Sequence, residues 1–443
     1  MARLLIRNGR ILDPGRGIDL VGDVLIVDGR IAGVGPGLTA DGAESIDASG
    51  LVVCPGFVDI HCHLRDPGFE YKETIATGTQ AAARGGFTTV CCMPNTQPAI
   101  DTRATVEYVL RTAATNGAVR VLPIGCVSRD RAGRELAELA ELAEAGCVAF
   151  SDDGAPVADG ALMRRALEYA RISGLPVIDH CEAPEIASGG VMHEGWVSTR
   201  LGLRGQPAAA EEAFVARDIA LAAQTGAPLH IAHVSTRAAV ELIRAAKERG
   251  LPVTAEVTPH HLTMTHRDVA FGSDGDEGLC YDTNAKMNPP LRTRDDVAAC
   301  VGGLRDGVID AIATDHAPHA DYEKACEFDE AAFGISGLET ALGLSMMLVE
   351  AGAIDLSTLV ERLTAGPVRA LGLERSVPGL GSLAEGAPGD VTVLDPNAEW
   401  TVEPERFASK GRNTPLGGRT LRGKVITTVV EGNIVWAEER VRA

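Results

Sequence analysis

Residues 52–63 read VVCPGFVDIHCH, an apolar run rich in β-branched residues that ends on two histidines. A run of this kind is typical of a buried strand, and we predict a strand over Val52–Ile60 with His61 directly after it. Alternate residues of a strand point to the same face, so His61 and His63 would both face one metal ion. Two polar residues can also stand at a strand end without binding a metal, however, so this pair alone does not establish a metal site.

The same pattern recurs through the middle of the chain, where short apolar runs alternate with segments rich in Ala, Leu and Glu. We predict eight strands: Val52–Ile60, Thr88–Met93, Val119–Gly125, Cys147–Ser151, Pro176–Asp179, Leu229–Ala232, Val253–Val257 and Ile309–Thr314. We predict helices between most of them: Thr102–Asn116, Glu135–Ala145, Ala161–Ser173, Glu211–Gln224 and Ala238–Arg249. Repeated strand–helix units favour a parallel sheet covered by helices. The predicted class is α/β, with a (β/α)₈ TIM-like barrel.

Both ends of the chain differ from this middle part. LLIRNGRIL and DVLIVDGRIAGVG near the start, and DVTVLDP and GKVITTVVEGNIVWAEE near the end, are short strands joined by turn residues such as Asn-Gly and Asp-Gly. We predict that both ends form one small composite β-sandwich domain. The predicted boundaries are 1–54 and 376–443 for the two parts of this domain and 55–375 for the barrel.

Composition excludes several classes of protein. The formal net charge of −20 argues against a general nucleic-acid binder, which needs a basic face. A hydrophobic fraction of 45% argues against a disordered chain. No apolar run approaches the roughly 20 residues of a membrane span, and the N-terminus has no signal-peptide pattern. The ten cysteines include no C-x-x-C pair, which favours reduced, buried thiols in a cytoplasmic protein.

Polar residues that suit a metal follow several of the predicted strands. In a parallel barrel the carboxyl ends of the strands converge on one face. The residues that would meet there are His61, His63, Asp153, His180, His233 and Asp315. Imidazole and carboxylate ligands suit Zn²⁺, with Mn²⁺ or Co²⁺ as alternatives. Six ligands exceed the usual three of one catalytic zinc, so we predict two metal ions.

The expected arrangement pairs the ligands across the barrel mouth. His61, His63 and Asp315 would hold one ion, and His180 and His233 the other, with a carboxylate between the ions. Spacing alone does not choose between Asp152 and Asp153 as that bridge. Two cations acting on one water lower its pKa and supply hydroxide near neutral pH.

Five motifs of the chain match a known family. They are GFVDIHCHLRDPG (Gly56–Gly68), MPNT (Met93–Thr96), FSDDG (Phe150–Gly154), KMNPPLR (Lys286–Arg292) and ATDHAPH (Ala313–His319). Together they resemble the dihydroorotases of the amidohydrolase superfamily, most of all the longer bacterial class. The arginine of H-L-R-D-P-G is the most specific feature, and the stretch 272–284 ahead of KMNPPLR is longer than the family pattern.

The resemblance implies a function and a set of site residues. It implies the reversible cyclisation of N-carbamoyl-L-aspartate to L-dihydroorotate in pyrimidine biosynthesis, with one or two zinc ions held by the six residues named above. It implies that Asp315 is the catalytic acid and base. It also implies a set of substrate-binding residues: His63, Arg65, Asn95, Asn288, His319, Phe333 and Gly334. Arg65 would hold a substrate carboxylate, and Phe333-Gly334 would lie on a loop that closes over the ring.

Two alternatives remain open from the sequence. A hydantoinase, dihydropyrimidinase or allantoinase would share the barrel and the metals, but an uncharged ring would have no use for Arg65. A non-catalytic scaffold that binds aspartate carbamoyltransferase is the other, although such a chain would typically have lost ligands. A homodimer and an active complex with aspartate carbamoyltransferase are compatible with the resemblance.

Overall fold

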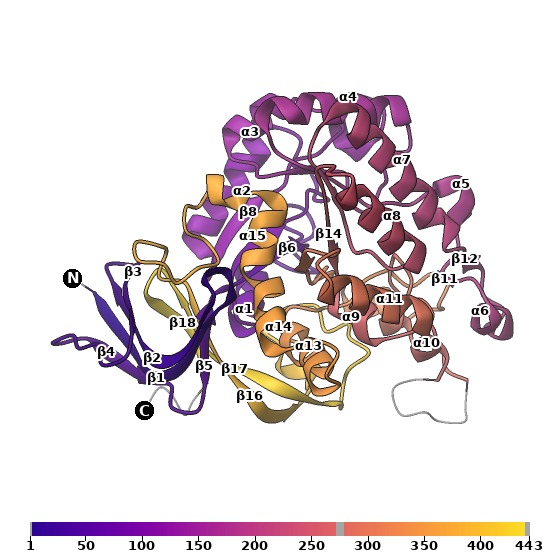
Figure 1. Ribbon diagram of the computed structural model, residues 1–443. Helices are drawn as coiled ribbons and strands as arrows, with labels where there is room; N and C mark the ends of the chain where they lie inside the picture. Colours follow the sequence, from indigo (N-terminus) through magenta and orange to yellow (C-terminus); the bar gives the residue numbers. More distant parts are fainter. Residues whose placement is uncertain (1, 272–278, 439–443) are drawn as a thin grey trace.

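The computed structural model describes residues 2–271 and 279–438, so part of the long stretch 272–284 lies outside the described residues. Figure 1 shows two regions. A sheet made from both ends of the chain lies at the lower left, and a larger region of short strands and helices occupies the rest. Indigo strands from the start of the chain lie beside yellow strands from its end.

The sheet at the lower left is called the terminal sheet below. Its eight strands run in the order β18-β17-β16-β5-β1-β2-β3, and β4 pairs with β1. The bounds are β1 (Arg3–Asp13), β2 (Ile18–Val27), β3 (Arg30–Gly35), β4 (Glu44–Asp47), β5 (Val52–Pro55), β16 (Val391–Thr401), β17 (Thr420–Val430) and β18 (Asn433–Ala437). Strands β1, β2 and β3 pair antiparallel, as do β16, β17 and β18. Both ends of the chain therefore contribute to one continuous sheet.

The prediction of a single strand over Val52–Ile60 is wrong, because this stretch forms two strands in different sheets. β5 pairs with β1 and β16 in the terminal sheet, whereas β6 (Phe57–Cys62) pairs with β7 (Phe87–Cys92). Gly56 lies between them, and a Cβ there would be 2.1 Å from Oγ1 of Thr88. Every residue of both strands is buried, so hydrophobicity alone gives no sign of the break.

The remaining long-range strand pairs are parallel and form two sheets, ordered β6-β7-β8 and β15-β14-β13-β10-β9. The further bounds are β8 (Arg120–Pro123), β9 (Phe150–Ser151), β10 (Val177–Asp179), β13 (Leu229–Ile231), β14 (Val253–Val257) and β15 (Ala311–Ile312). Isolated parallel bridges join Gly125 to Phe150 and Cys62 to His316. Several strands are shorter than predicted, because their polar ends turn into the loops that carry the site. A separate short pair is β11 (Met192–His193) with β12 (Gly205–Gln206).

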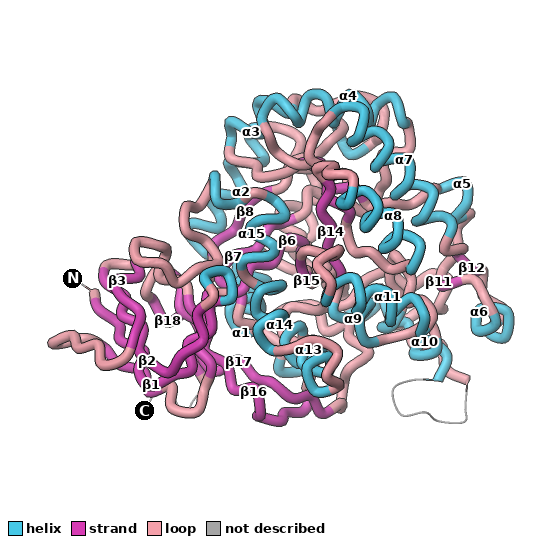
Figure 2. Tube along the Cα trace, in the orientation of Figure 1, coloured by secondary structure: helices cyan, strands magenta, loops and turns pink. Residues whose placement is uncertain are grey.

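Helices surround the parallel strands, as Figure 2 shows in cyan around magenta. Their bounds are α1 (Ile75–Arg84), α2 (Arg103–Asn116), α3 (Leu139–Ala145), α4 (Gly160–Ser173), α5 (Pro184–Ala187), α6 (Trp196–Leu201), α7 (Ala209–Thr225), α8 (Arg237–Glu248), α9 (Pro259–Thr263), α10 (Arg267–Phe271), α11 (Arg294–Arg305), α12 (Asp321–Lys324), α13 (Ala341–Glu350), α14 (Leu356–Leu363) and α15 (Ala365–Leu371). Threonine N-caps start α2 and α8, at Thr102 and Thr236. Helix α3 begins later than the predicted Glu135.

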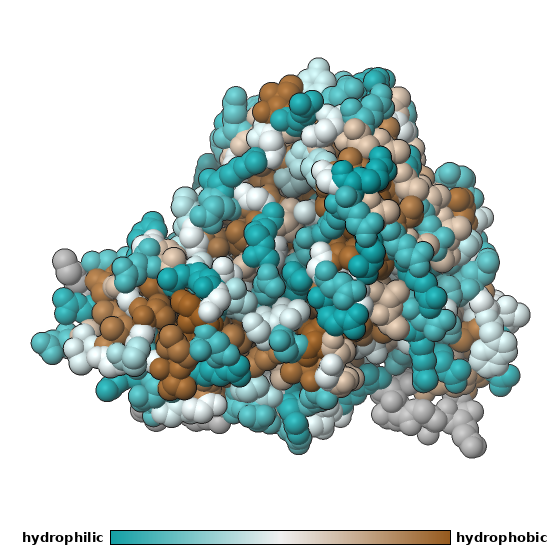
Figure 3. Space-filling view, viewed as in Figure 1, coloured by the Kyte–Doolittle hydropathy of each residue, from teal (hydrophilic) through white to brown (hydrophobic). Residues whose placement is uncertain are grey.

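The main core lies between the parallel strands and these helices, where rings such as Phe57 and Phe87 meet edge to face with centroids 5.8 Å apart. The face seen in Figure 3 is mostly hydrophilic, with its broadest hydrophobic patch over the terminal sheet. All ten cysteines are free, and only Cys280 and Cys326 are not buried. No helix in the described ranges is long and apolar enough to cross a membrane.

Candidate metal centre and substrate pocket

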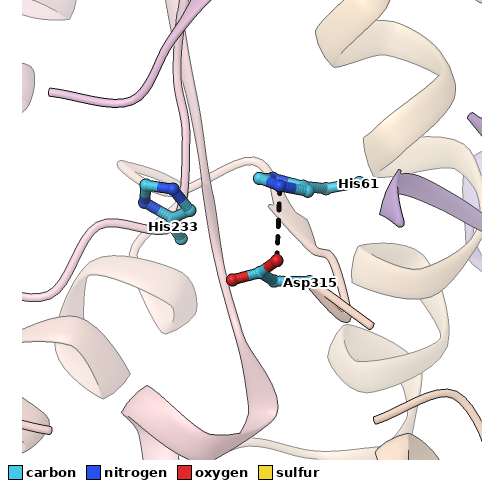
Figure 4. Close-up of side chains that lie close together, drawn as sticks. All are labelled: His61, His233 and Asp315. Carbon is cyan, nitrogen blue, oxygen red and sulfur yellow. Dashed lines mark ion pairs between the residues drawn. The ribbon is translucent and has the colours of Figure 1, made fainter. Parts of the chain in front are cut away.

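The six side chains predicted as metal ligands stand at the carboxyl ends of five parallel strands, β6, β9, β10, β13 and β15, and converge on one buried point. Their ligand atoms form three sets, in each of which all atoms lie within 4.8 Å of one another. The sets are His61–His233–Asp315, His61–His63–Asp153 and Asp153–His180–His233. Figure 4 shows the first set, with the ion pair between His61 and Asp315 as a dashed line. The short strands therefore bring together residues separated by more than 250 positions.

The structure distinguishes the two adjacent aspartates that the sequence left open. Oδ1 of Asp153 lies 3.4 Å from Nε2 of His61 and 3.7 Å from Nε2 of His233. Asp152 instead accepts hydrogen bonds from the backbone N–H groups of Val127 and Ser128, at 2.9 and 3.0 Å, and from the Ser128 hydroxyl. Neighbouring residues at a strand end point in opposite directions, so only Asp153 faces the imidazoles.

The atoms at the centre of this cluster fit a bound cation. Nε2 of His61 and Oδ1 of Asp153 are buried and have no hydrogen-bond partner among the described residues. Nδ1 of His180 lies 2.8 Å from Nε2 of His233. Buried polar atoms are normally satisfied, and nitrogen and carboxylate oxygen donors at this spacing suit divalent metals such as zinc. The residues present therefore match a metal centre.

Electrostatics keep the two aspartates of the cluster ionised. Burial alone would raise the pKa of Asp315, but the charge of His61 and a hydrogen bond from His63 outweigh it and hold the pKa below its usual range. Burial opposes ionisation of Asp153 as well, and the charge of His61 again lowers the pKa well below the ordinary value. Both carboxylates are thus available as acceptors at neutral pH.

Each of three imidazoles is also held from its outer side. Nδ1 of His61 lies 2.5 Å from Oε1 of Glu256, and Nδ1 of His63 lies 2.8 Å from Oδ1 of Asn95. Nδ2 of Asn288 lies 3.2 Å from Nε2 of His180. Sequence reasoning missed Glu256, although a lone charged residue in the buried strand VTAEV was a usable signal.

Sequence reasoning also missed Glu182, which accepts hydrogen bonds of 2.7 Å from both Asn288 and Gln206. No pattern marked this residue, because it stands in a loop two positions after His180. Glu182 fixes the Asn288 amide beside the imidazole. Asn288 therefore lies beside His180, in the lining of the same cavity as the cluster.

A cavity of about 290 Å³ opens beside the cluster. Its lining contains every predicted site residue except His61, which lies deeper. The lining residues are His63, Arg65, Asn95, Asp153, Gly154, His180, His233, Asn288, Asp315, Ala317, His319, Phe333 and Gly334. This volume suits a small molecule.

Arg65 brings a buried positive charge to the cavity. The residue is only 9% exposed, and its Nε–H donates to the carbonyl oxygen of Pro318 at 3.3 Å. Among the described residues, no carboxylate forms a salt bridge with its guanidinium. Asp315 and Asp153 still act on it electrostatically. A buried guanidinium without a bonded anion is suited to a substrate carboxylate.

The far wall of the cavity is a loop held by the C-terminal part of the chain. Nε2 of His319 lies 2.8 Å from the carbonyl oxygen of Phe333. Asn413 accepts from the backbone N–H of His319 at 2.9 Å, and its Nδ2 donates to the carbonyl oxygens of Ala317 and Gly334, both at 3.0 Å. Sequence reasoning missed Asn413, because nothing in its position signals contact with residues almost 100 positions away.

Similarity to solved structures agrees with this architecture. An L-hydantoinase (dihydropyrimidinase) from Arthrobacter aurescens superposes with a TM-score of 0.86 at 24% identity, over 100% of this chain and 97% of the other. The dihydropyrimidinase from Brevibacillus agri NCHU1002 superposes with a TM-score of 0.84 at 24% identity, over 98% and 95%. This level of identity speaks for the fold alone. The fold together with the His/Asp cluster defines an α/β protein with a buried candidate metal centre.

Sequence similarity is more specific. The family model "Dihydro-orotase-like" matches residues 50–239. The chain is 54% identical to the dihydroorotase of Syntrophotalea carbinolica, over 98% of this chain and 99% of that one, and 56% identical to the dihydroorotase of Anaeromyxobacter sp. (strain K), over 98% of both. The chain belongs to the dihydroorotase family.

Proposed function

We propose that this chain is a zinc-dependent dihydroorotase that interconverts N-carbamoyl-L-aspartate and L-dihydroorotate, a step of pyrimidine biosynthesis. The observation that carries the proposal is the buried, unpaired Arg65 in the same cavity as the His/Asp cluster. The substrate has a carboxylate for the arginine and a cyclic amide for the cluster. The full-length similarity to dihydroorotases supports the same assignment.

We assign the metal ligands as the six clustered side chains, with two zinc ions and Asp153 between them. The three overlapping sets of ligand atoms support two positions better than one, because His61, His233 and Asp153 each belong to two sets. The metals would act as Lewis acids and lower the pKa of the attacking water.

The cavity residues would position the substrate around this cluster. Arg65 would hold the substrate carboxylate with two hydrogen bonds. Asn95 and His319 would add hydrogen bonds beside it, and Asn288 would bind from the opposite wall, since all three line the cavity. Phe333 and Gly334 would cover the ring and exclude water.

Asp315 would then move the proton. In ring opening, its carboxylate accepts a proton from the water that attacks the ring carbonyl carbon. The C–N bond of the ring breaks, and Asp315 delivers the same proton to the leaving nitrogen. Ring closure is the reverse and takes up one further proton from solution, because a dianion becomes a monoanion plus water. Lower pH therefore favours cyclisation.

Further parts of the assignment follow the same reasoning. The two bridges between the parallel sheets support closure into a (β/α)₈ barrel over 55–375, and the shared terminal sheet supports one domain from 1–54 and 376–443, which we propose to be a β-sandwich. We also propose a cytoplasmic location. A homodimer or a complex with aspartate carbamoyltransferase is the expected assembly.

The test is an assay of the zinc-loaded protein with L-dihydroorotate, hydantoin, dihydrouracil and allantoin in parallel. We expect ring opening of dihydroorotate at a kcat/KM at least a hundredfold above the uncharged rings. Preference for an uncharged ring would favour the hydantoinase alternative. Metal binding without turnover of any ring would favour the scaffold alternative, which the presence of all six ligands argues against.

A further inference from the structure

We infer that Glu256 is a positioning residue of the metal centre: its buried carboxylate holds His61 in the tautomer and orientation that bind metal, and a second histidine, His230, holds the carboxylate. The inference rests on the proposed function, because it concerns the same metal centre. It adds a residue that does not line the substrate cavity.

The contact between Glu256 and His61 fixes which nitrogen faces the cluster. Oε1 of Glu256 lies 2.5 Å from Nδ1 of His61, and both side chains are 0% exposed. A carboxylate is an acceptor only, so Nδ1 of His61 carries the proton. Nε2 of His61 is then the nitrogen that offers a lone pair to a metal once it is deprotonated, and this buried atom points at Asp153 and Asp315 without a hydrogen-bond partner among the described residues.

The other oxygen of Glu256 contacts a second histidine, His230. Oε2 lies 3.1 Å from Nε2 of His230, and Nδ1 of His230 lies 2.8 Å from Oγ1 of Thr254. His230 is fully buried, and both of its ring nitrogens are hydrogen-bonded. The resulting chain, Thr254–His230–Glu256–His61, runs from the strand interior to the cluster. Each carboxylate oxygen therefore has one imidazole donor.

This support differs from that of the other ligands. The outer nitrogen of His63 meets the neutral amide of Asn95, and that of His180 meets the amide of Asn288 at 3.2 Å with the Glu182 carboxylate farther away, at 3.7 Å. Nδ1 of His61, in contrast, lies only 2.5 Å from a carboxylate oxygen. A carboxylate bonded to a ligating histidine orients the ring and raises its basicity, and its loss typically costs about 10- to 100-fold in metal affinity or activity. His61 also belongs to two of the three ligand sets, so its orientation affects both metal positions.

The alternative is that Glu256 and His230 form an ion pair that only stabilises the core. The two roles differ in what a substitution changes. Loss of a purely structural pair would lower the free energy of unfolding and leave metal affinity untouched. Loss of a positioning carboxylate would lower metal affinity even in protein that remains folded.

The experiment measures Zn²⁺ affinity of the full-length protein by competition with a chelating dye, for wild type and Glu256→Gln. Glutamine keeps the shape: its carbonyl oxygen accepts from His61, and its amide donates to His230 when the His230 proton sits on Nδ1. We expect zinc affinity to fall about 10- to 100-fold. With zinc saturating, KM for dihydroorotate should stay within twofold while kcat falls, since Glu256 does not touch the cavity.

Glu339→Gln is the matched control, because the Glu339 carboxylate is also buried but bonds the backbone N–H groups of Ala408 and Ser409 and pairs with Arg84 at 3.2 Å. It should change stability and leave zinc affinity at the wild-type value. Thr254→Val is a second, milder variant that removes only the hydroxyl beside His230, and we expect a roughly threefold loss of zinc affinity. The inference is overturned if the Glu256→Gln protein folds and binds zinc with wild-type affinity. If Glu256→Gln does not fold, wild-type zinc affinity in Thr254→Val overturns it instead.

The outcome separates this inference from the proposed function. Wild-type zinc binding and dihydroorotate turnover combined with unchanged affinity in the variants would overturn the inference alone. A wild-type protein that bound no zinc would overturn both.

Discussion

A charged pair of the terminal sheet lies at the surface, whereas the candidate metal ligands at the ends of the parallel strands are buried and face one another. In the terminal sheet, Arg10 on β1 and Asp19 on β2 are diagonal neighbours, about half exposed, and are joined by two hydrogen bonds of 2.8 Å. At the ends of β6 and β15, His61 and Asp315 are almost fully buried, and their nearest nitrogen and oxygen atoms are 3.5 Å apart.

The difference follows from how each region is built. The long antiparallel strands of the terminal sheet expose one edge or face to water. Charged side chains there stay hydrated, so their ion pairs contribute little to the free energy of unfolding. The short parallel strands are buried on both faces, so a polar group at their ends needs a partner or an ion. The polar side chains that could bind metal are therefore concentrated at the ends of the parallel strands.

The largest expected effect sharpens this contrast with one substitution made in both regions. Asp315→Asn removes the proposed acid and base, and we expect kcat for dihydroorotate to fall about 10²- to 10⁴-fold. Asp19→Asn removes an exposed partner of Arg10, and we expect unchanged kcat with less than about 1 kcal/mol change in stability. Steady-state kinetics and denaturant unfolding measure both. Equal kinetic effects in the two regions would contradict the division of roles.

A second prediction concerns the buried charge of the cavity. Arg65→Gln removes two charge-assisted hydrogen bonds to the substrate carboxylate, together worth about 3 kcal/mol. We expect KM for dihydroorotate to rise about a hundredfold, with little change in the already weak turnover of dihydrouracil. A variant that lost activity equally on both rings would show that Arg65 acts on the metal centre instead.

A third prediction concerns the loop over the cavity. Gly334 has φ +140°, and a Cβ there would lie 2.6 Å from Cβ of Ala317 and 3.3 Å from the His319 ring. Gly334→Ala should displace the loop and lower kcat/KM about tenfold. Gly250→Ala is the control, because Gly250 has φ +72° but nothing within 4 Å, so only the backbone cost of about 1 kcal/mol is expected. Similar kinetics for both variants would place Gly334 outside the substrate site.

The smallest effect is a pH dependence of stability away from the site. Burial raises the pKa of Glu339 from 4.5 to about 7. The folded protein thus holds this proton over a range in which the unfolded chain releases it, and stability falls as pH rises between about 4.5 and 7. Relative to Glu339→Gln, wild type should lose at most about 3 kcal/mol across this range. Urea unfolding at several pH values measures the difference, and a flat difference would refute the assignment.

Sequence patterns predicted the parts of the fold that depend on local chemistry. Alternating apolar and polar residues, together with turn residues, located the strands at both ends. Apolar runs located the parallel strands to within a few residues. The sequence did not predict the break between β5 and β6 at Gly56, because both strands are fully buried. Only the close approach of Gly56 to Thr88 marks the break. Such a contact depends on the tertiary structure and cannot be seen in the local amino-acid pattern.

The site was predictable where residues stand at strand ends and unpredictable where they act across the fold. His61 and Asp315 were found because a parallel sheet gathers its carboxyl ends. The choice of Asp153 over Asp152 needed the hydrogen bonds of Ser128. Glu256 and Asn413 were missed, since one lies inside a strand and the other almost 100 residues from the loop it holds. The metal-binding and substrate-binding roles of these residues remain predictions.

The central claim is that six buried side chains bind two zinc ions. Anomalous diffraction at the zinc absorption edge, from crystals of the zinc-loaded protein, tests it most directly. We predict two peaks, one beside His63 and Asp315 and one beside His180 and His233, with Asp153 between them. Zinc-loaded crystals without a peak among these residues would contradict the account.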